Sequence, residues 1–294
     1  MKAKIIFFGS SKFVIPILEV LRKNFDLSLV LTTENPKVSK GDLAPPRRGY
    51  PVVKYCVENK IPYLSIQQFN NSTIEQLKTI HSPVAVLADF GLIIPKEILN
   101  AFPKGIINIH PSLLPKYRGP TPVQTAILNG EKTTGVSIMK LDQEIDHGPI
   151  LGQEKEEILP TDTSETLYKT LFEKGANLLL KVLPDYLNGN LNPTAQNHKE
   201  ATFTKPLTRQ DGYLDVSNEA TAVAKIDTMI RAYYPWPGVW TRLRLGSGGQ
   251  AKLKIIKFLP GNRIQVEGKK PISYEDFKNG YPNLKQIHVL LDHL

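Results

Sequence analysis

The first half of the chain alternates short apolar runs with stretches whose apolar residues recur at helical spacing. Apolar runs of about four to eight residues that are separated by amphipathic segments are typical of parallel βαβ units. The pattern therefore predicts an α/β domain with a doubly wound, mostly parallel, Rossmann-like sheet. The expected strands are 4–9, 27–33, 61–66, 84–90 and 105–110, and the expected helices are 15–21 and 52–60.

The second half begins with the clearest amphipathic helix, residues 164–187, which Thr163 or Ser164 can cap. The polar, turn-rich stretch that follows indicates a linker, and a further helical pattern covers 218–232. Short alternating runs then suggest the strands of a small β-barrel or sandwich. These runs are 238–245, 251–259, 262–268 and 287–294. We therefore expect three parts: an α/β domain over 1–187, a linker over 188–205 and a smaller C-terminal β-barrel domain over 206–294.

Bulk properties narrow the class of protein. No stretch approaches the about 18 to 20 apolar residues of a membrane helix, and the apolar run Ile5–Phe8 is too short for a signal peptide. We therefore expect a cytoplasmic protein that does not enter a membrane. Cys56 is the only cysteine, which excludes an intramolecular disulfide and a cysteine-rich metal site. Its helical surroundings favour a buried structural thiol over a nucleophile.

Neither of the common nucleotide-binding motifs is present. The turn after the first predicted strand, Gly9–Ser11, lacks the glycine pattern that binds dinucleotides. The proline-rich loop at 34–50 lacks the pattern of a phosphate-binding P-loop. The sequence therefore does not indicate NAD or ATP.

The formal net charge of +9 is concentrated in the C-terminal third. Residues 201–294 hold 14 Lys and Arg against 8 Asp and Glu, whereas the first 200 residues hold 23 against 20. From Arg242 to Lys270 there are eight basic residues and one acid, Glu267. A local positive field favours a polyanionic partner, of which nucleic acid is the commonest. The alternation in two predicted strands would place their basic residues on one face, suited to phosphates.

The most informative segment is 105–148. Asn108 and His110 lie two apart at the end of a predicted strand, so both side chains point to one face. Prolines at 111 and 115 then force the chain to leave the sheet as a loop. Asp146 lies in a turn after another apolar run. Ligands of open α/β sheets bind outside the carboxyl ends of strands, which is where this loop begins.

An amide, an imidazole and a carboxylate suit the transfer of an acyl group to an amine. Asn108 and a protonated His110 can donate hydrogen bonds to the oxygen that becomes negative, and Asp146 can hold the imidazole or pass protons through a water. Taken singly, each residue has an ordinary alternative. A histidine after a strand is commonly structural, and an aspartate before His-Gly commonly forms a turn. Spacing alone does not bring residue 146 next to residue 110.

Several motifs, in order along most of the chain, resemble those of the 10-formyltetrahydrofolate-dependent formyltransferases. Within that family they most resemble the members that act on methionyl-tRNA. NIHPSLLPKYRGPTPVQTAILNG and TGVSIMKLDQEIDHG resemble the family's signature region, and FFGSSKFVIPIL, PVAVLADFGLIIPKEIL, LTRQDGYLDVSNEA and IRAYYPWPGVWT resemble its other motifs. The resemblance implies an enzyme that moves a formyl group from 10-formyltetrahydrofolate to the amino group of initiator methionyl-tRNA, without a metal.

Matching positions carry the family's roles to this sequence. Asn108, His110 and Asp146 match its catalytic trio. Contacts to the folate are implied for Ser112, Leu113, Leu114, Pro115, Phe90, Gly91, Leu92 and Ile93. Contacts to tRNA are implied for the basic loop residues Lys37, Lys40, Arg47 and Arg48, and the basic strands suggest Arg242, Arg244, Lys252 and Lys254 as well.

The sequence departs from the family's pattern in places. Asp146-His147-Gly148 stands where relatives usually have Asp-Thr-Gly, and we expect the His147 side chain to face solvent. Asp89 places a carboxylate near the expected folate pocket. The basic loop is unusual and the C-terminal domain is short, so an amino-sugar nucleotide is the alternative acceptor. A catalytically silent RNA-binding protein is a third alternative, against which the intact trio argues. A monomer without an obligate protein partner is the default expectation.

Overall fold

The computed structural model describes residues 2–33, 50–246 and 252–294 of the chain. They fold into two compact units. The first unit holds Met1–Pro122, Thr133–Glu157 and Tyr168–Thr204, and the second holds Val123–Lys132, Ile158–Leu167 and Lys205–Leu294. Most of the expected linker, residues 188–204, therefore belongs to the first unit.

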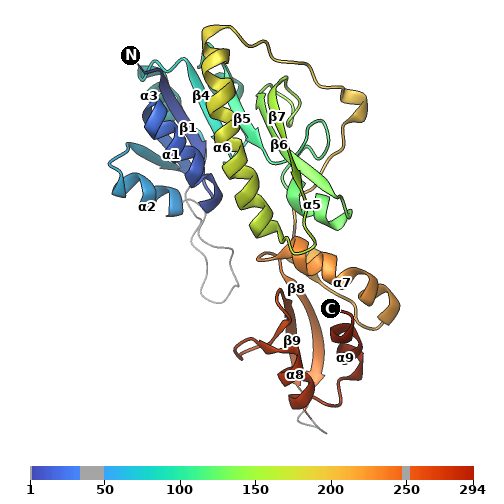
Figure 1. The fold of residues 1–294 in the computed structure, drawn as a ribbon. Coiled ribbons are helices and arrows are strands. Elements are labelled where there is room, and N and C mark those ends of the chain that lie inside the picture. The colour runs from blue at the N-terminus through green and yellow to red at the C-terminus, as the bar shows by residue number, and fades with distance from the viewer. Residues whose placement is uncertain (1, 34–49, 247–251) are drawn as a thin grey trace. The chain divides into compact units, whose positions relative to one another are not determined.

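A seven-stranded sheet in the order β3-β2-β1-β4-β5-β6-β7 forms the centre of the first unit (Figure 1). The first five strands are parallel: β1 (Lys4–Gly9), β2 (Asp26–Thr33), β3 (Tyr63–Ile66), β4 (Val84–Ala88) and β5 (Ile106–His110). The last two, β6 (Thr133–Lys140) and β7 (Ile150–Glu157), each run antiparallel to the preceding strand. The prediction of a mostly parallel α/β sheet is confirmed. β7 has no clear apolar pattern because it is a polar strand at the edge of the sheet.

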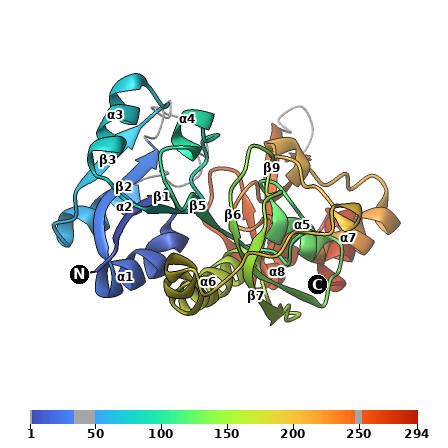
Figure 2. The same ribbon diagram turned by 90° about the horizontal axis from the view of Figure 1, so that it is seen from above.

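Helices cover both faces of this sheet, as Figure 2 shows. Alternate residues of β1 point to opposite faces, Ile5 and Phe7 to one apolar cluster and Ile6 and Phe8 to another. The first cluster includes α1 (Ile15–Asn24), α2 (Tyr50–Glu58) and α6 (Ser164–Asn188), and the second includes α3 (Asn71–Thr79) and α4 (Lys96–Leu99). The sheet is therefore doubly wound. A short helix, α5 (Pro122–Leu128), connects the loop after β5 to β6.

The second unit contains an open antiparallel sheet in the order β11-β10-β9-β8. Its strands are β8 (Val239–Leu245), β9 (Lys252–Leu259), β10 (Arg263–Val266) and β11 (Ile272–Ser273), and its main helices are α7 (Glu219–Tyr233), α8 (Tyr274–Gly280) and α9 (Lys285–Asp292). Among the residues described, β8 and β11 are not paired with each other, so the predicted closed barrel is not formed. Four strands, one of them only two residues long, are too few to close on themselves.

One predicted strand of this unit is wrong. Residues 287–292 of the run at the C-terminus lie in α9, which buries Ile287, Leu290 and Leu291. Their spacing of three and four residues is helical, whereas the interpretation as a strand relied on apolar content. In the described part of the chain, no helix is both long enough and apolar enough to cross a bilayer.

The thiol of Cys56 gives a prediction about alkaline pH. Cys56 is fully buried on α2, and burial raises the pKa of its thiol to about 11. Well below pH 9 the thiol is protonated in both the folded and the unfolded chain, and it does not make stability depend on pH. As the pH rises from about 9 to about 11 the unfolded chain loses this proton first. The free energy of unfolding therefore falls by about 2 to 3 kcal/mol over that range. Free energies of unfolding from urea titrations should fall with pH more steeply for the wild type than for Cys56→Ala in this range. The same pH dependence for both proteins would contradict the raised pKa of Cys56.

Candidate active site

The structure brings Asn108, His110 and Asp146 into one cluster. Asn108 and His110 lie on β5 and are 6% and 5% exposed. β6 returns antiparallel beside β5, and the backbone N–H of Leu141 after it donates to the carbonyl of Ile106. The chain then folds back along β5, so that Asp146, 38 residues beyond Asn108 in sequence, lies within hydrogen-bond distance of it.

The carboxylate of Asp146 is the centre of this cluster. Its Oδ1 accepts a hydrogen bond from Nδ2 of Asn108 (3.2 Å), and its Oδ2 accepts one from the backbone N–H of Gly119 (2.8 Å). Oδ2 also lies 3.6 Å from Nδ1 of His110. Asp146 has a φ of +48°, a left-handed conformation that aspartate tolerates better than most residues. The carboxylate is largely buried, and burial of a charge without such donors is strongly unfavourable.

The hydrogen bonds of His110 determine which ring nitrogen can exchange a proton. Nε2 lies 3.0 Å from the carbonyl oxygen of Tyr117. A carbonyl only accepts, so Nε2 must carry a hydrogen in the neutral ring. Nδ1, which faces Asp146, then carries a lone pair in the neutral ring and a second hydrogen in the imidazolium. Its 3.6 Å separation from Oδ2 exceeds a good hydrogen bond, which leaves Nδ1 available to a bound molecule.

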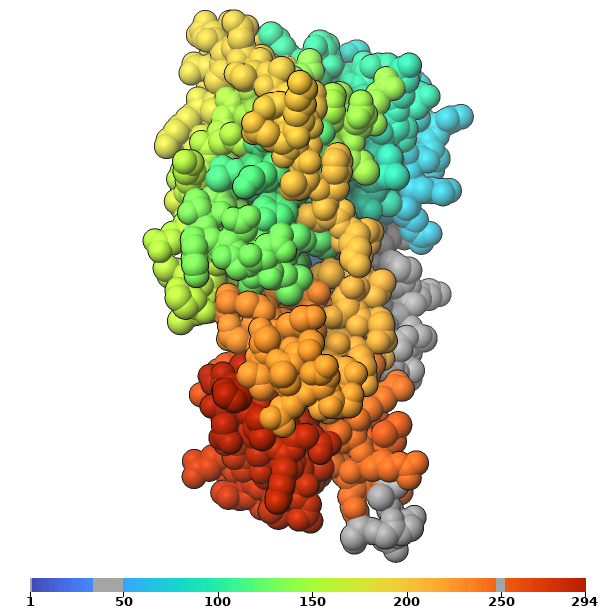
Figure 3. Space-filling model, turned by 90° about the vertical axis from the view of Figure 1, so that its right-hand side faces the viewer, coloured from blue at the N-terminus to red at the C-terminus, as the bar shows by residue number. Residues whose placement is uncertain are grey.

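Part of the segment predicted to be a linker lies against this cluster. Residues 202–204 pair with the loop 117–119, which supplies the Tyr117 carbonyl and the Gly119 N–H. The backbone N–H of Arg118 donates to the carbonyl of Thr202 (2.9 Å), and that of Thr204 donates to the carbonyl of Arg118 (2.7 Å). Figure 3 shows the segment as a continuous yellow-to-orange band on the surface of the first unit. Nothing in its turn-rich composition indicates this role.

The loop Ser112–Pro115, expected to contact the folate, is fixed by a buried serine that the sequence did not single out. Ser137 on β6 donates its hydroxyl to the carbonyl of Ser112 (2.6 Å) and accepts from the N–H of Leu114 (3.0 Å). Gln153 on β7 donates to the same hydroxyl (2.8 Å) and to the carbonyl of Leu114 (2.9 Å). Ser112 and Leu114 are buried, while Leu113 and Pro115 are partly exposed.

The other expected folate segment, Phe90–Ile93, is split between core and surface. Phe90 is buried and its ring stacks on Phe8, 5.4 Å between centroids, so its side chain belongs to the core. Gly91 has a φ of +84° and turns the chain outward. Leu92 is half-buried and Ile93 is 93% exposed. Of these side chains, only Leu92 and Ile93 offer apolar surface to a ligand.

The two residues that depart from the family's pattern have different settings. Asp89 is exposed, with a φ of +43°. We expected the His147 side chain to face solvent, but it is only 26% exposed. Its Nδ1 lies 2.7 Å from Oδ2 of Asp142, and its ring stacks on His198 with 3.9 Å between centroids.

The basic residues of the C-terminal strands do not share one face, which corrects the expectation from their alternation. Residues directly opposite each other in an antiparallel pair point to the same side. Arg242 lies opposite Ile255 and Arg244 opposite Leu253, whereas Lys254 lies opposite Leu243 and Lys252 opposite Leu245. The two arginines therefore point to one face and the two lysines to the other. Lys37, Lys40, Arg47 and Arg48 lie outside the described residues.

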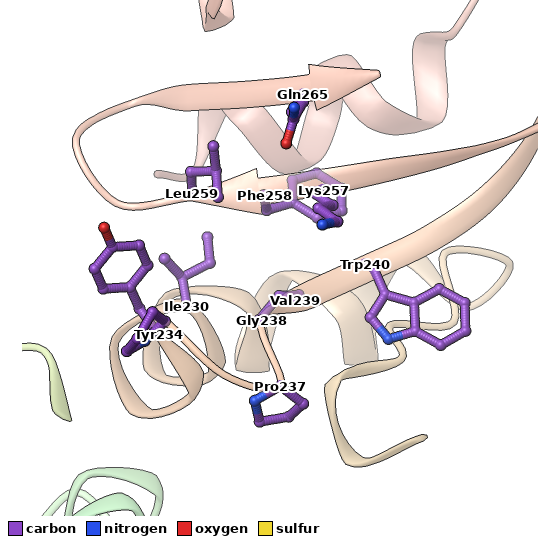
Figure 4. Close-up of a pocket in the computed structure, with 11 residues that line it drawn as sticks. Ile230, Tyr234, Pro237, Gly238, Val239, Trp240, Lys257, Phe258, Leu259 and Gln265 are labelled. Atoms are coloured by element: carbon purple, nitrogen blue, oxygen red, sulfur yellow. The ribbon is translucent and has the colours of Figure 1, made fainter. Parts of the chain in front are cut away.

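The face that carries Arg242 has further basic groups around Trp240. The guanidinium groups of Arg209 and Arg242 lie 5.3 and 5.4 Å from the Trp240 ring. Lys257 lies directly opposite Trp240, and burial, together with the charge of Arg209, lowers the pKa of its ammonium group. Trp240 and Lys257 also line a cavity of about 90 Å³, the volume of a few water molecules, formed with Tyr234, Pro237 and Phe258 among others (Figure 4). We call Arg209, Trp240, Arg242, Arg244 and Lys257 the basic face.

Comparison with known proteins decides the family. The family model described as formyl transferase matches residues 1–183. The chain belongs to the formyl transferase family. A methionyl-tRNA formyltransferase of Chloroflexus aurantiacus is 41% identical over 257 residues, which cover 86% of this chain and 79% of that protein. A methionyl-tRNA formyltransferase of Thermus thermophilus is 38% identical over 236 residues, which cover 80% of this chain and 74% of that protein.

Solved structures share the fold of this formyl transferase. A 4-N formyltransferase from Francisella tularensis superposes with a TM-score of 0.63 at 19% identity, covering 86% of this chain and 96% of its own. A glycinamide ribonucleotide transformylase from Symbiobacterium toebii superposes with a TM-score of 0.54 at 20% identity, covering 67% and 95%. At such identities the likeness concerns the fold alone.

The contacts of Ser137 lead to a prediction about the loop Ser112–Pro115. Ser137→Ala leaves the N–H of Leu114, the carbonyl of Ser112 and part of the Gln153 amide without their buried partner. Because unsatisfied buried groups are costly, we expect a loss of about 2 to 4 kcal/mol in the free energy of unfolding. Ser28, a half-buried residue whose hydroxyl bonds only locally, is the control, and Ser28→Ala should change stability by less than about 0.5 kcal/mol. Equal effects of the two variants would contradict this role.

Proposed function

We propose that this formyltransferase transfers the formyl group of 10-formyltetrahydrofolate to the amino group of methionyl-tRNA. The observation that carries the proposal is the convergence of Asn108, His110 and Asp146 within hydrogen-bonding range, in a chain of the formyl transferase family. The acceptor is supported by relatives up to 41% identical that are named methionyl-tRNA formyltransferase. We further propose that the enzyme works as a monomer in the cytoplasm.

The co-substrate supplies an activated formyl group, and the loop Ser112–Pro115 with Leu92 and Ile93 would hold its folate part. These residues fit such a molecule because backbone groups and apolar side chains lie together near the carboxyl ends of β4 and β5. Ile93 in particular is a large apolar side chain left exposed, so it offers apolar surface to a bound ring.

Asn108 and His110 would stabilise the negative charge that develops on the formyl oxygen as the amine attacks. The amide of Asn108 has two hydrogens, of which one is bonded to Asp146, so the other can point to the oxygen. The Nδ1–H of the His110 imidazolium can donate to the same oxygen, because Nε2 is bonded to Tyr117. Two such donors are typical of sites for acyl transfer.

Asp146 would balance the positive charge of the His110 ring and accept the proton that the amine must lose. Its Oδ2 lies 3.6 Å from Nδ1 of His110, so a carboxylate lies beside the ring that would donate to the formyl oxygen. The attacking amine forms a bond to the formyl carbon and gives up one proton, and the bond from that carbon to the folate nitrogen breaks. The carboxylate can take the proton directly or through a water, and a proton is returned to the folate nitrogen.

The basic face of the second unit supports tRNA as the acceptor. Four cations, Arg209, Arg242, Arg244 and Lys257, lie on or beside one face of the sheet. No acid pairs with them among the ion pairs of the described residues. We propose that this face, and not the opposite face with Lys252 and Lys254, meets phosphates. Lys37, Lys40, Arg47 and Arg48 remain proposed contacts. The amino-sugar nucleotide, the alternative acceptor, is too small to use such a surface.

Substitution of His110 and Asp146 tests the chemistry. His110→Ala and Asp146→Asn should lower kcat for formylation of methionyl-tRNA by about 10²- to 10⁴-fold, because each removes a charged group from the transition state. Formylmethionine released from the tRNA measures the rate, and amino-sugar nucleotides are offered in parallel. Asp142→Asn, the same change in the same loop, should retain near-normal activity. A wild-type enzyme that formylates only an amino sugar would refute the acceptor, and full activity of His110→Ala would refute the mechanism.

Salt dependence tests the basic face. The logarithm of the dissociation constant for tRNA should rise linearly with the logarithm of salt concentration, with a slope of roughly 0.7 to 0.9 per phosphate contacted. Arg242→Gln with Lys257→Gln should lower that slope by about 1 to 2. Lys252→Gln with Lys254→Gln removes the same charge from the opposite face and should leave the slope nearly unchanged. Equal slopes for the two double variants would show that only net charge matters.

A further inference from the structure

A buried amide lies directly behind the candidate active site and has no part in the mechanism above. Gln196, in the segment after α6, is 6% exposed. Its Nε2 donates to the carbonyl of Asp146 (2.9 Å) and to the carbonyl of Gly148 (2.7 Å). Its Oε1 accepts from both Nε (3.2 Å) and Nη2 (2.7 Å) of Arg118. Both hydrogens and both lone pairs of this amide are therefore used.

These bonds hold the Asp146 carboxylate from two directions. On one side, Gln196 fixes the backbone of the turn 146–148, in which Asp146 has its left-handed conformation. On the other side it fixes Arg118, whose neighbour Gly119 donates its N–H to Oδ2 of Asp146. Arg118 is 3% exposed, and its Nη2 also lies 2.8 Å from Nδ1 of His198. One side chain thus ties together the two loops whose alignment sets the position of the carboxylate.

We propose that Gln196 is a positioning residue that keeps Asp146 in register with Asn108 and His110. The inference rests on the proposed catalytic role of Asp146. It also gives the segment 194–204 a function, because that segment completes the active site instead of only connecting two units. Displacement of a catalytic group by about 1 Å can reduce a rate by about 100-fold, so an amide that fixes the turn affects kcat although it contacts no reacting atom.

Gln196→Glu is the most specific test, because it exchanges the NH2 group for an oxygen and keeps the shape of the side chain. A carboxylate still accepts from Arg118 and can form an ion pair with it. It has no hydrogens for the carbonyls of Asp146 and Gly148, and its charge repels both oxygens. We expect kcat for methionyl-tRNA to fall on the order of 10- to 100-fold, with KM for the folate changed less than about twofold.

The experiment is a double-mutant cycle measured in single turnovers at saturating enzyme. Wild type, Gln196→Glu, Asp146→Asn and the double variant are compared, with melting temperatures for each. If Gln196 acts through Asp146, Gln196→Glu should change the rate less than about twofold once Asp146 is already Asn. Gln143→Glu, the same change at an exposed position of the β6–β7 connection, is the matched control and should match the wild type.

The outcomes separate the inference from the function on which it rests. A wild type that does not formylate methionyl-tRNA would refute the proposed function. If the wild type is active and Gln196→Glu is equally active, the positioning role is overturned. It is also overturned if the rate of the double variant is reduced by the product of the factors for Gln196→Glu and Asp146→Asn alone. If Gln196→Glu does not fold, Gln196→Met, of similar volume and without hydrogen bonds, takes its place. The same loss of kcat is expected from it, and a normal kcat would overturn the proposal.

Discussion

The site depends on how one largely buried carboxylate is satisfied. Asp146 carries a negative charge in a place where water reaches only a small part of it, and such a charge is tolerated only with donors around it. The protein supplies the Asn108 amide, the Gly119 backbone N–H and the His110 ring. Asn108 and His110 lie on β5, Gly119 lies in the loop after it and Asp146 lies in the β6–β7 connection, so the fold must bring these three parts of the chain to one point.

The antiparallel strands make this possible. Here β6 runs back along β5, and the connection to β7 returns over the face that carries Asn108 and His110. The segment after α6 then pairs with the loop 117–119 and inserts Gln196 between it and the turn at Asp146. These bonds leave two groups for the proposed chemistry, one hydrogen of the Asn108 amide and Nδ1 of His110.

Local pattern predicted much of the fold, and it failed where partners far away in sequence decide the outcome. The apolar strands β1 to β5 and the helix α6 were predictable because each follows its own periodicity. β7 was not, since an edge strand exposes most of its side chains. The run at the C-terminus was assigned to a strand although Ile287, Leu290 and Leu291 are spaced as in a helix. Lys252 and Lys254 were grouped with Arg242 because alternation defines a face within a strand, whereas the register between strands decides which faces coincide.

The candidate site shows the same division. The pairing of Asn108 with His110 follows from the period of a strand, but only resemblance to a family linked them to Asp146. No pattern pointed to Gln196 or Ser137, because a glutamine in a turn-rich segment and a serine in a strand have many ordinary roles. Phe90 was assigned to the folate pocket with its neighbours, while its ring lies in the core.

The proposed chemistry requires His110 to present Nδ1 to the reacting group, with Nε2 bonded to the Tyr117 carbonyl. Nitrogen-15 NMR of the histidine ring in the wild-type enzyme distinguishes the two ring nitrogens. We expect a neutral ring protonated at Nε2, and we expect Asp146→Asn to shift the Nδ1 signal more than the Nε2 signal. A neutral ring protonated at Nδ1 would rule out this role of His110.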